Sequence, residues 1–531
     1  GRPVSASVPT APAAAGRGPP RRAGAVLATL VLSAFLCNVN LAVANVALPD
    51  IGRSLGASQT ALTMIATGCS LYFGALGDRY GRKLMLTLGL VITVPASMLS
   101  AWAPNPEVLI AGRVLTGLAA GMAFPTTLAL ITALWAEGPG RTKAIALWSS
   151  VSGGAAALGP FLAGLMLEKF WWGSVFLIAV PLAVIAVVLV VALVPAHVNE
   201  SDKRVDHIGG VLSVLFIAAL VSGIAHISSP GRQVVSLCLI GASLVLATGF
   251  VFRELRAANP LYDLHYARRR MFWAPAVAGL IAFGSLMGTM FVGQQFLQNV
   301  LQYTTFEAGA AILPGAFGMV AVARISARLL VTYGSRLTML LGFILLAVSF
   351  ATMLVGWHES TPYWLVGIAY LCLGAGAGLI LTPASRSLMC SVPVTRVGMG
   401  SGTSDLQRDL GGSIMQALLG ALLTIGYAKA FSAQVAASPD ASEVTAQTKA
   451  ALLQSFSSAE TLAARYPQYQ EQIVSAARTS FLDGANWAYA AGLTAVILGA
   501  VLALVAIPAK PKEIALLTAY AKADGTGAVT S

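Results

Sequence analysis

An acidic pair separated by one helical turn is the feature of this sequence best suited to chemistry. Asp405 and Asp409 lie four residues apart, with Arg408 beside them, and the apolar run that follows begins at Gly411. Residues at this spacing share one face of a helix. Two carboxylates that are close together and partly removed from water cannot both ionise freely, so one is suited to bind and release a proton. The alternative interpretation is a salt-linked helix end at the membrane boundary.

Few other side chains could carry a proton or drive a reaction. Glu307 is a second, weaker candidate, because a carboxylate at that position also suits a helix start. The sequence holds no Gly-x-x-x-x-Gly-Lys-Ser/Thr loop for ATP, and no His-Glu-x-x-His or Cys-x-x-Cys metal motif. We therefore expect no metal, no cofactor and no enzymatic reaction, and we expect an ion gradient to supply the energy.

The elements that position these residues are membrane-spanning helices. Of 531 residues, 57% are hydrophobic and only 10% are charged, with a mean hydropathy of +0.77. A soluble chain of this length needs far more charge to cover its surface. Apolar runs of roughly 20 residues, the length that crosses a bilayer core, repeat along the chain. The net charge of +12 is spread in small clusters between these runs, which argues against a nucleic-acid partner.

Fourteen apolar runs read as spans, so the expected fold is an all-α polytopic membrane protein. We predict them at Gly24–Leu48, Ser58–Gly77, Leu84–Trp102, Val108–Leu134, Ala144–Leu167, Val175–Val194, Ile208–Ile227, Val234–Phe252, Trp273–Phe296, Ala308–Val331, Leu337–Trp357, Trp364–Thr382, Gly411–Tyr427 and Ala485–Ile507. Most of the 33 Lys and Arg fall in alternate loops, which places both termini in the cytoplasm.

An internal repeat divides the chain into two bundles of six spans. GALGDRYGRKLMLTLG after the second span matches ARLLVTYGSRLTMLLG after the tenth at the Tyr-Gly pairs beginning at Tyr80 and Tyr333. Such repeats are typical of secondary transporters. The predicted layout is a disordered cytoplasmic tail at 1–23, a bundle at 24–196, two inserted spans at 197–272, a bundle at 273–507 and a cytoplasmic tail at 508–531. Segment 429–484 reads as an external helical hairpin.

Three strings resemble the major facilitator superfamily. The loop GALGDRYGRK is similar to the signature loop of that superfamily, which assigns a functional role to Gly74, Gly77, Asp78, Arg79, Gly81, Arg82 and Lys83. Arg113 in IAGRVLTGLAAG resembles an intramembrane arginine motif, although an arginine there could also extend to the outer interface. Span 5 resembles the antiporter motif of exporters, at Gly153, Gly154, Gly159, Pro160 and Gly164.

Together with the fourteen-span layout, these strings resemble the drug:proton antiporter family, including its quaternary-ammonium and multidrug exporters. The sequence departs from that family at Asn40, where members usually carry an aspartate. Asn40 and Trp148 are the candidates for lining a cavity. The resemblance implies a monomeric antiporter in the plasma (inner) membrane that exports amphipathic or cationic small molecules in exchange for protons. Export of an endogenous lipid or metabolite is the alternative, and a channel or intramembrane enzyme is the alternative of a different class.

Overall fold

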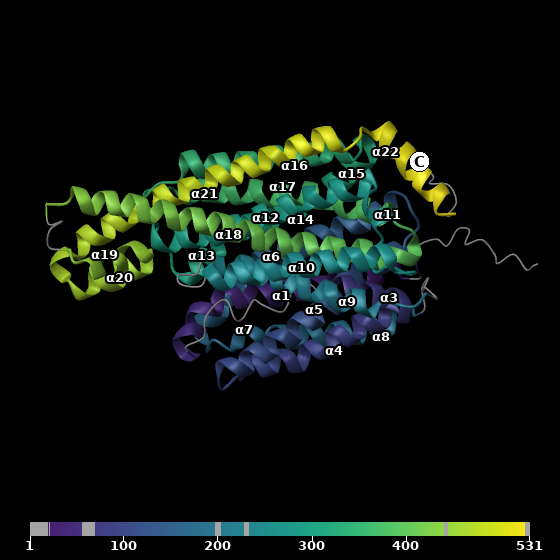
Figure 1. The fold of residues 1–531 in the computed structure, drawn as a ribbon, viewed down its shortest axis with the longest axis horizontal. Helices are drawn as coiled ribbons and strands as arrows, with labels where there is room; N and C mark the ends of the chain where they lie inside the picture. The colour runs from purple at the N-terminus through teal and green to yellow at the C-terminus, as the bar shows by residue number, and fades with distance from the viewer. Residues whose placement is uncertain are drawn as a thin grey trace, which may run out of the picture.

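The structure is a computed structural model that describes residues 20, 22–55, 70–196, 203–227, 233–439 and 444–525. These residues form helices joined by short turns, with no strand among them (Figure 1). The helices are α1 (Ala23–Leu55), α3 (Ser70–Tyr80), α4 (Arg82–Ala101), α5 (Pro106–Leu134), α6 (Pro139–Lys169), α7 (Ser174–Leu177), α8 (Ala179–Leu193), α9 (His207–Ile227), α10 (Gln233–Arg256), α11 (Leu264–Ala267), α12 (Arg270–Asn299), α13 (Thr305–Ala311), α14 (Leu313–Ala321), α15 (Ala323–Tyr333), α16 (Ser335–Gly356), α17 (Tyr363–Cys390), η1 (Val394–Arg396), α18 (Val397–Ala437), α19 (Ala446–Gln454), α20 (Phe456–Arg465), η2 (Pro467–Tyr469), α21 (Gln470–Ala506) and α22 (Lys510–Ala523).

Within the described ranges, 13 helices or helix runs are long and apolar enough to cross a membrane. They coincide with every predicted span except the second, which confirms the all-α polytopic fold. The second predicted span, Ser58–Gly77, lies largely outside the described residues, and only its end appears, in α3. The count of fourteen therefore stays a prediction, and the predicted disordered tail at 1–23 likewise lies almost entirely outside the described residues.

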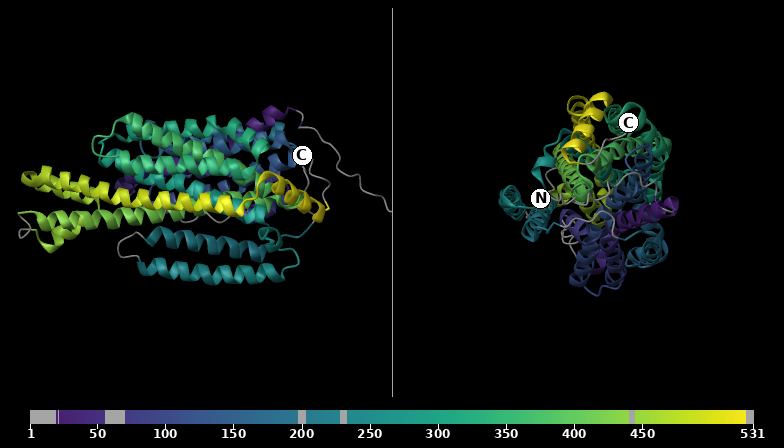
Figure 2. Two further views of the ribbon diagram at one scale, coloured as in Figure 1. Left: turned by 90° about the horizontal axis from the view of Figure 1, so that it is seen from above. Right: turned by 90° about the vertical axis from the view of Figure 1, so that its right-hand side faces the viewer.

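The spanning helices pack around two large apolar clusters. One lies among α1, α4, α5, α6 and α8 and includes Leu30, Leu86 and Leu128. The other lies among α12, α16, α17, α18 and α21 and includes Phe343 and Tyr370. Helices α9 and α10 pack against each other and stand at the outer edge of the molecule (Figure 2), and α9 also contacts α3 and α18. The domain boundaries that we draw from the sequence stay predictions.

The internal repeat has a structural counterpart at its two glycines. Gly81 and Gly334 have φ angles of 116° and 87°, which side chains with a Cβ rarely adopt, and each ends one helix and precedes the next. After each turn, a second glycine lets the new helix approach a neighbour closely: Gly89 meets Ala119 of α5, and Gly342 meets Gly376 of α17. The matching strings therefore specify matching turns in the two halves.

The thirteenth and tenth predicted spans differ from the structure. The thirteenth, predicted at Gly411–Tyr427, belongs to the 41-residue helix α18. Its first turns are polar and glycine-rich, so hydropathy missed them, but they are covered by protein instead of lipid and need not be apolar. The tenth, predicted as one span, is three helices, α13 to α15, interrupted at Ile312 and Val322.

The described residues of segment 429–484 form a helical hairpin whose long arms continue two membrane helices, and its external position stays a prediction. The arms are the ends of α18 and α21, and α19 and α20 cover their tip (Figure 1). Gly426 and Gly484 bring the arms together, and the Tyr427 hydroxyl donates to the Leu452 carbonyl oxygen at 3.0 Å. The apolar core of the bundle continues into the hairpin through Phe456 and Phe481.

The segment after the last span, predicted only as a tail, contains helix α22 that is bound to the bundle. Glu513 is buried and accepts hydrogen bonds from the N–H and hydroxyl of Ser335, the former at 2.9 Å. Asp524 pairs with Arg269, at 2.9 and 2.7 Å, and Arg269 also donates to the Ser391 carbonyl oxygen. These contacts tie α22 and Asp524 to the ends of neighbouring helices.

Candidate functional site

The acidic pair lies inside α18 and not at the entrance to a helix, because α18 begins well before Gly411, where the predicted span starts. Asp405 is fully buried, and Asp409 is 9% exposed. The helix begins at Val397, about two turns before Asp405. Arg408 holds both carboxylates: its Nη2 lies 2.8 Å from Asp405 Oδ1, and its Nε lies 3.3 Å from Asp409 Oδ1. We call these three residues the charged centre.

The charged centre contacts the other half of the molecule through Arg408. Its Nη1 donates to the Asn38 side-chain oxygen of α1 at 3.0 Å, and its guanidinium lies 4.3 Å from the centre of the Phe124 ring of α5. Sequence reasoning missed Asn38. A polar amide in the middle of an apolar span was the signal that could have identified it. The centre is thus shared between α18 of one half and α1 and α5 of the other.

The carboxylates outnumber the cation in the charged centre. Two carboxylates and one guanidinium give a formal charge of −1 when all three are ionised, and the three side chains are at least nine-tenths buried. Asp409 Oδ2 accepts no hydrogen bond from any described residue. Because a buried charge without compensation is costly, this centre favours the arrival of a proton or another cation.

The signature loop joins α3 to the start of α18. Asp78 accepts from Arg82 at 2.8 Å and from the backbone N–H of Gly398 at 2.7 Å, and Arg82 also donates to the Val394 carbonyl oxygen. Gly398 lies in the first turn of α18, where unpaired N–H groups attract an anion. The carboxylate of one half therefore caps a helix of the other half.

Some of the remaining loop residues touch the start of α18, and others do not. Gly74 packs directly on Gly398, since a Cβ at Gly74 would lie 2.5 Å from the Gly398 carbonyl oxygen. Gly77 has no such restriction, with its nearest neighbour at 3.5 Å. Lys83 donates to the Val191 carbonyl oxygen at 2.9 Å, and Arg79 lies 5.9 Å from the Tyr80 ring centre. The close contact thus depends on Gly74 and Asp78.

Gly74→Ala tests this contact, with Gly77→Ala as the matched control. The added methyl at Gly74 meets backbone of α18, so we expect the two helices to separate and transport to fall at least tenfold. At Gly77 the same methyl meets the flexible Met85 side chain, and we expect transport near that of the wild type. Equal activity of the two variants, measured in vesicles at equal protein content, would contradict the close contact.

Arg113 and Asn40 lie together in the first half. Arg113 is 7% exposed, its Nη1 donates to the Asn40 side-chain oxygen at 3.4 Å, and the Asn40 amide faces Ser97 Oγ at 3.5 Å. The Phe176 ring centre is 5.3 Å from the guanidinium. Arg113 is therefore buried within the protein and does not extend to the outer interface. No carboxylate of the described residues forms an ion pair with it.

The antiporter-motif helix α6 packs against the opposite half. Gly153 faces Met319 of α14, Gly154 faces Val320, and Gly164 lies against Phe306 of α13. Gly159 packs on Ala42 of α1, and the Pro160 carbonyl oxygen contacts Gly309. Small residues along α6 therefore allow close approach on two sides, as membrane helix packing requires.

The last two candidates, Trp148 and Glu307, lie in different surroundings. Trp148 is buried, donates to Thr127 Oγ1 at 2.8 Å and packs on Phe124, the ring that contacts Arg408. Glu307 lies far from the charged centre in the sequence and is exposed at the start of α13. There it forms a capping box with Thr304. The structure therefore brings Trp148 near the charged centre and leaves Glu307 as a helix cap. Among the described residues, no group of His, Cys, Asp or Glu could hold a metal ion.

Comparisons with known proteins agree with this architecture. Residues 30–416 match the family model of the Major Facilitator Superfamily. The chain is 30% identical over 495 residues to the multidrug efflux pump LfrA of Mycolicibacterium smegmatis, covering 92% of this chain and 95% of that protein. It is also 30% identical over 500 residues to the methyl viologen resistance protein SmvA of Salmonella typhimurium, covering 91% and 96%.

A solved structure shares the fold at low sequence identity. The human organic anion transporter MFSD10 (TETRAN) superposes with a TM-score of 0.56 at 13% identity, covering 91% of this chain and 100% of that chain. This likeness concerns the fold alone. With the family match over most of the chain, it leads to one conclusion: the chain belongs to the major facilitator superfamily of membrane transporters.

Proposed function

We propose that this protein is a proton-coupled exporter of amphipathic or cationic small molecules that works by alternating access between its two halves. The observation that carries the proposal is the buried charged centre, which holds two carboxylates against one arginine and bonds across to Asn38. The multidrug efflux pump LfrA supports export as the direction, and SmvA, named for resistance to the organic dication methyl viologen, supports cationic substrates.

The charge of the centre explains how exchange could work. With all groups ionised it lacks one positive charge, and either a proton on a carboxylate or a cationic substrate nearby can supply it. Both together would leave an excess positive charge in a buried site. Proton and substrate therefore compete to neutralise the same negative charge, and such competition is what antiport requires. Since Asn40 cannot titrate, the first helix offers no carboxylate at that position to share this role.

The contact between Arg408 and Asn38 links the charge of the centre to the position of the two halves. A proton on Asp405 or Asp409 weakens the hold of that carboxylate on Arg408, and so changes the bond that Arg408 makes to the other half. A ligand shifts a conformational equilibrium only by binding the two states differently. Here the two states differ in the bond between Arg408 and Asn38, because that bond exists only while the two halves are in contact.

The direct test is proton release by purified protein in vesicles after addition of a substrate. We expect methyl viologen to release protons, and a neutral antibiotic or a lysophospholipid to release fewer. Proton release by the lysophospholipid alone would favour the alternative, an exporter of endogenous lipid. Substrate movement that is unchanged when the proton gradient is collapsed would contradict proton coupling.

Orientation has its own prediction. We propose that the protein is a monomer in the plasma membrane. We place both termini in the cytoplasm, because basic residues concentrate in alternate loops. Cysteines introduced at Ser201 and Ser531, both outside the described residues, should react only with reagents that reach the cytoplasm. A cysteine at Ser457, in α20 of the hairpin, should react from outside. Labelling of Ser457 from the cytoplasm would contradict the fourteen-span topology.

A further inference from the structure

One buried arginine of the described residues has no carboxylate beside it. Four of the described arginines are buried, with exposed fractions between 3% and 8%. Three of them form ion pairs, at distances from 2.7 to 3.3 Å, namely Arg82, Arg269 and Arg408. The fourth, Arg113 of α5, forms none with any described carboxylate. Because an uncompensated buried charge is costly, this guanidinium favours the binding of an anion.

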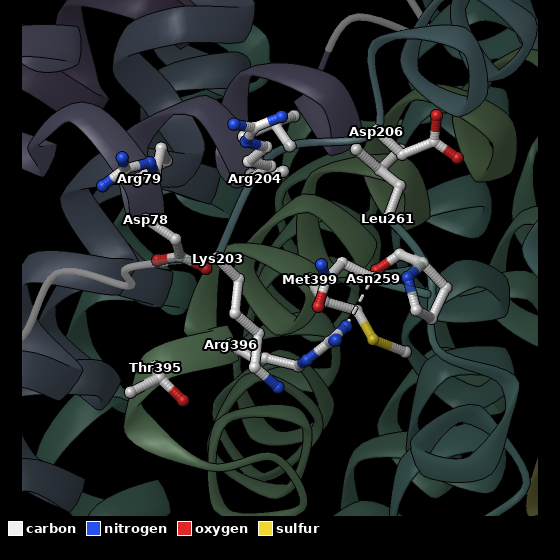
Figure 3. Close-up of a pocket in the computed structure, with 13 residues that line it drawn as sticks. Asp78, Arg79, Lys203, Arg204, Asp206, Asn259, Leu261, Thr395, Arg396 and Met399 are labelled. Carbon is white, nitrogen blue, oxygen red and sulfur yellow. Dashed lines mark hydrogen bonds between the residues drawn. The ribbon is translucent and has the colours of Figure 1, made fainter. Parts of the chain in front are cut away.

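The cavity beside the signature loop shows how charges are paired elsewhere in the described residues. Three of the charged side chains that line it form ion pairs (Figure 3). These pairs are Asp78 with Arg82 at 2.8 Å, Asp206 with Arg253 at 2.9 Å, and Arg396 with Asp263 at 3.9 Å. Local pairing is therefore common in this chain, and Arg113 departs from it.

The side chains around Arg113 can donate hydrogen bonds to an anion. Arg113 Nη1 donates to the Asn40 side-chain oxygen at 3.4 Å, and the Asn40 amide nitrogen donates to Ser97 Oγ at 3.5 Å. Both contacts are longer than the usual range of roughly 2.7–3.2 Å, so neither group has a strong partner. Asn40 and Ser97 are 3% and 1% exposed. A guanidinium, an amide and a hydroxyl therefore meet in the protein interior, with no described carboxylate among them.

The charged centre does not supply the missing negative charge. Asn38, which bonds to Arg408, and Asn40, which bonds to Arg113, are two positions apart on α1. Residues at that spacing do not share a face of a helix, so Arg113 and the charged centre lie on different sides of α1. The Phe176 ring centre is 5.3 Å from the Arg113 guanidinium, but a ring attracts a cation more weakly than an anion does.

We propose that Arg113, Asn40 and Ser97 bind a small monovalent inorganic anion, with chloride as the ion to test. The anion would accept hydrogen bonds from the guanidinium, the amide and the hydroxyl, and would bring the formal charge of the site to zero. A doubly charged anion such as sulfate is disfavoured, because its second charge would have no partner. The proposal depends neither on what the protein exports nor on whether protons drive export.

The test is the thermal stability of the purified full-length protein while sodium chloride replaces sodium gluconate at constant ionic strength. A ligand that binds only the folded protein stabilises it increasingly as its concentration exceeds the dissociation constant. We therefore expect the melting temperature of the wild type to rise with chloride. Bromide, which has the same charge and a similar size, should act in the same way.

Asn40→Asp is the decisive variant, because it places a permanent negative partner beside Arg113. It should need at least tenfold more chloride for the same rise in melting temperature. In gluconate it should be as stable as the wild type is in chloride. The matched control is Asn105→Asp, the same substitution at the exposed N-cap of α5, where an aspartate can keep the hydrogen bond from the Val108 N–H. The control should respond to chloride like the wild type.

Ser97→Ala is a second variant that tests the site without adding a charge. It removes one donor, so the chloride concentration for a given rise in melting temperature should increase about fivefold. An unchanged chloride response in both Ser97→Ala and Asn40→Asp would place the effect elsewhere and overturn the proposal.

Three further outcomes would overturn the proposal. The first is a wild-type melting temperature that does not change when chloride replaces gluconate. The second is an equal loss of the chloride response in Asn105→Asp, which would indicate a general effect of surface charge. The third is stabilisation by acetate without stabilisation by chloride, which would make this a site for a carboxylate group, such as one on a transported solute.

Discussion

Replacing Asp405 and Asp409 together by asparagine should abolish substrate-induced proton release, reducing it at least tenfold to the level of empty vesicles. Asparagine preserves the shape of each side chain but cannot exchange a proton. Arg408 then remains as an uncompensated buried cation, so binding of cationic substrates should weaken, whereas a neutral substrate should still bind. The measurement is a pH-sensitive dye trapped in vesicles, alongside substrate binding by the purified protein.

The single variant Asp409→Asn separates coupling from folding. Losing one partner of a buried ion pair can cost about 3–5 kcal/mol, so the double variant could fail to fold. Asp409→Asn leaves Asp405 and Arg408 as a neutral pair at 2.8 Å and removes the oxygen that has no partner among the described residues. It should fold and lose most proton release. Glu307→Gln is the matched control, because it removes an exposed carboxylate of the second half. Full coupling in the Asp409 variant with loss in the Glu307 variant would reverse the assignment.

Asp78→Ala should open the end of the transporter that carries the signature loop, which we propose faces the cytoplasm. It removes two charge-assisted contacts between the halves, those of Asp78 with Gly398 and, through Arg82, with Val394. Hydrogen bonds to charged groups contribute about 1.5–3 kcal/mol each, so losing one shifts the balance between access states by about tenfold or more. A cysteine at the buried Ser401, in a variant lacking the five native cysteines, should react correspondingly faster with a cytoplasmic reagent.

Two further variants test whether this effect is specific. Asp78→Asn keeps an oxygen for the Gly398 N–H but loses the charge, so we expect an intermediate rate. Asp263→Ala removes another carboxylate near Arg396, whose contact spans 3.9 Å, and should leave the rate unchanged. Equal rates in the wild type and the Asp78→Ala protein would reduce the signature loop to a topological marker.

Features that depend on local sequence were predictable. Long apolar runs must become spanning helices, because backbone polar groups in a bilayer have to be satisfied within the segment. The turns at Gly81 and Gly334 were likewise visible, because only glycine readily adopts their φ angles. Hydropathy failed for the first turns of α18, because it measures affinity for lipid and those residues contact protein.

Contacts between distant segments were not predictable from one sequence. Asn38 and Arg408 are 370 positions apart, and a single amide in an apolar helix does not indicate which partner it will have. The ion pair between Arg269 and Asp524 has the same character. The roles of Asp405, Arg408 and Asp409 could be suggested from their spacing, but their depth could not, since depth is set by the helices packed around α18.

The 41 residues of α18 form one continuous helix that runs from the charged centre into the helical hairpin, which we propose lies outside the cell. From Asp405 to Ala437 the helix measures about 48 Å, so a tilt of about 5° at the charged centre would carry the far end about 4 Å. Because α21 is packed against α18 at Gly426 and Gly484, the two arms should move together. Under the proposed topology and proton coupling, movement of the hairpin tip would report protonation of the charged centre from outside the cell. A spin label or fluorophore at Ser457 could follow transport without entering the substrate path. An antibody that binds the hairpin tip could inhibit transport from outside.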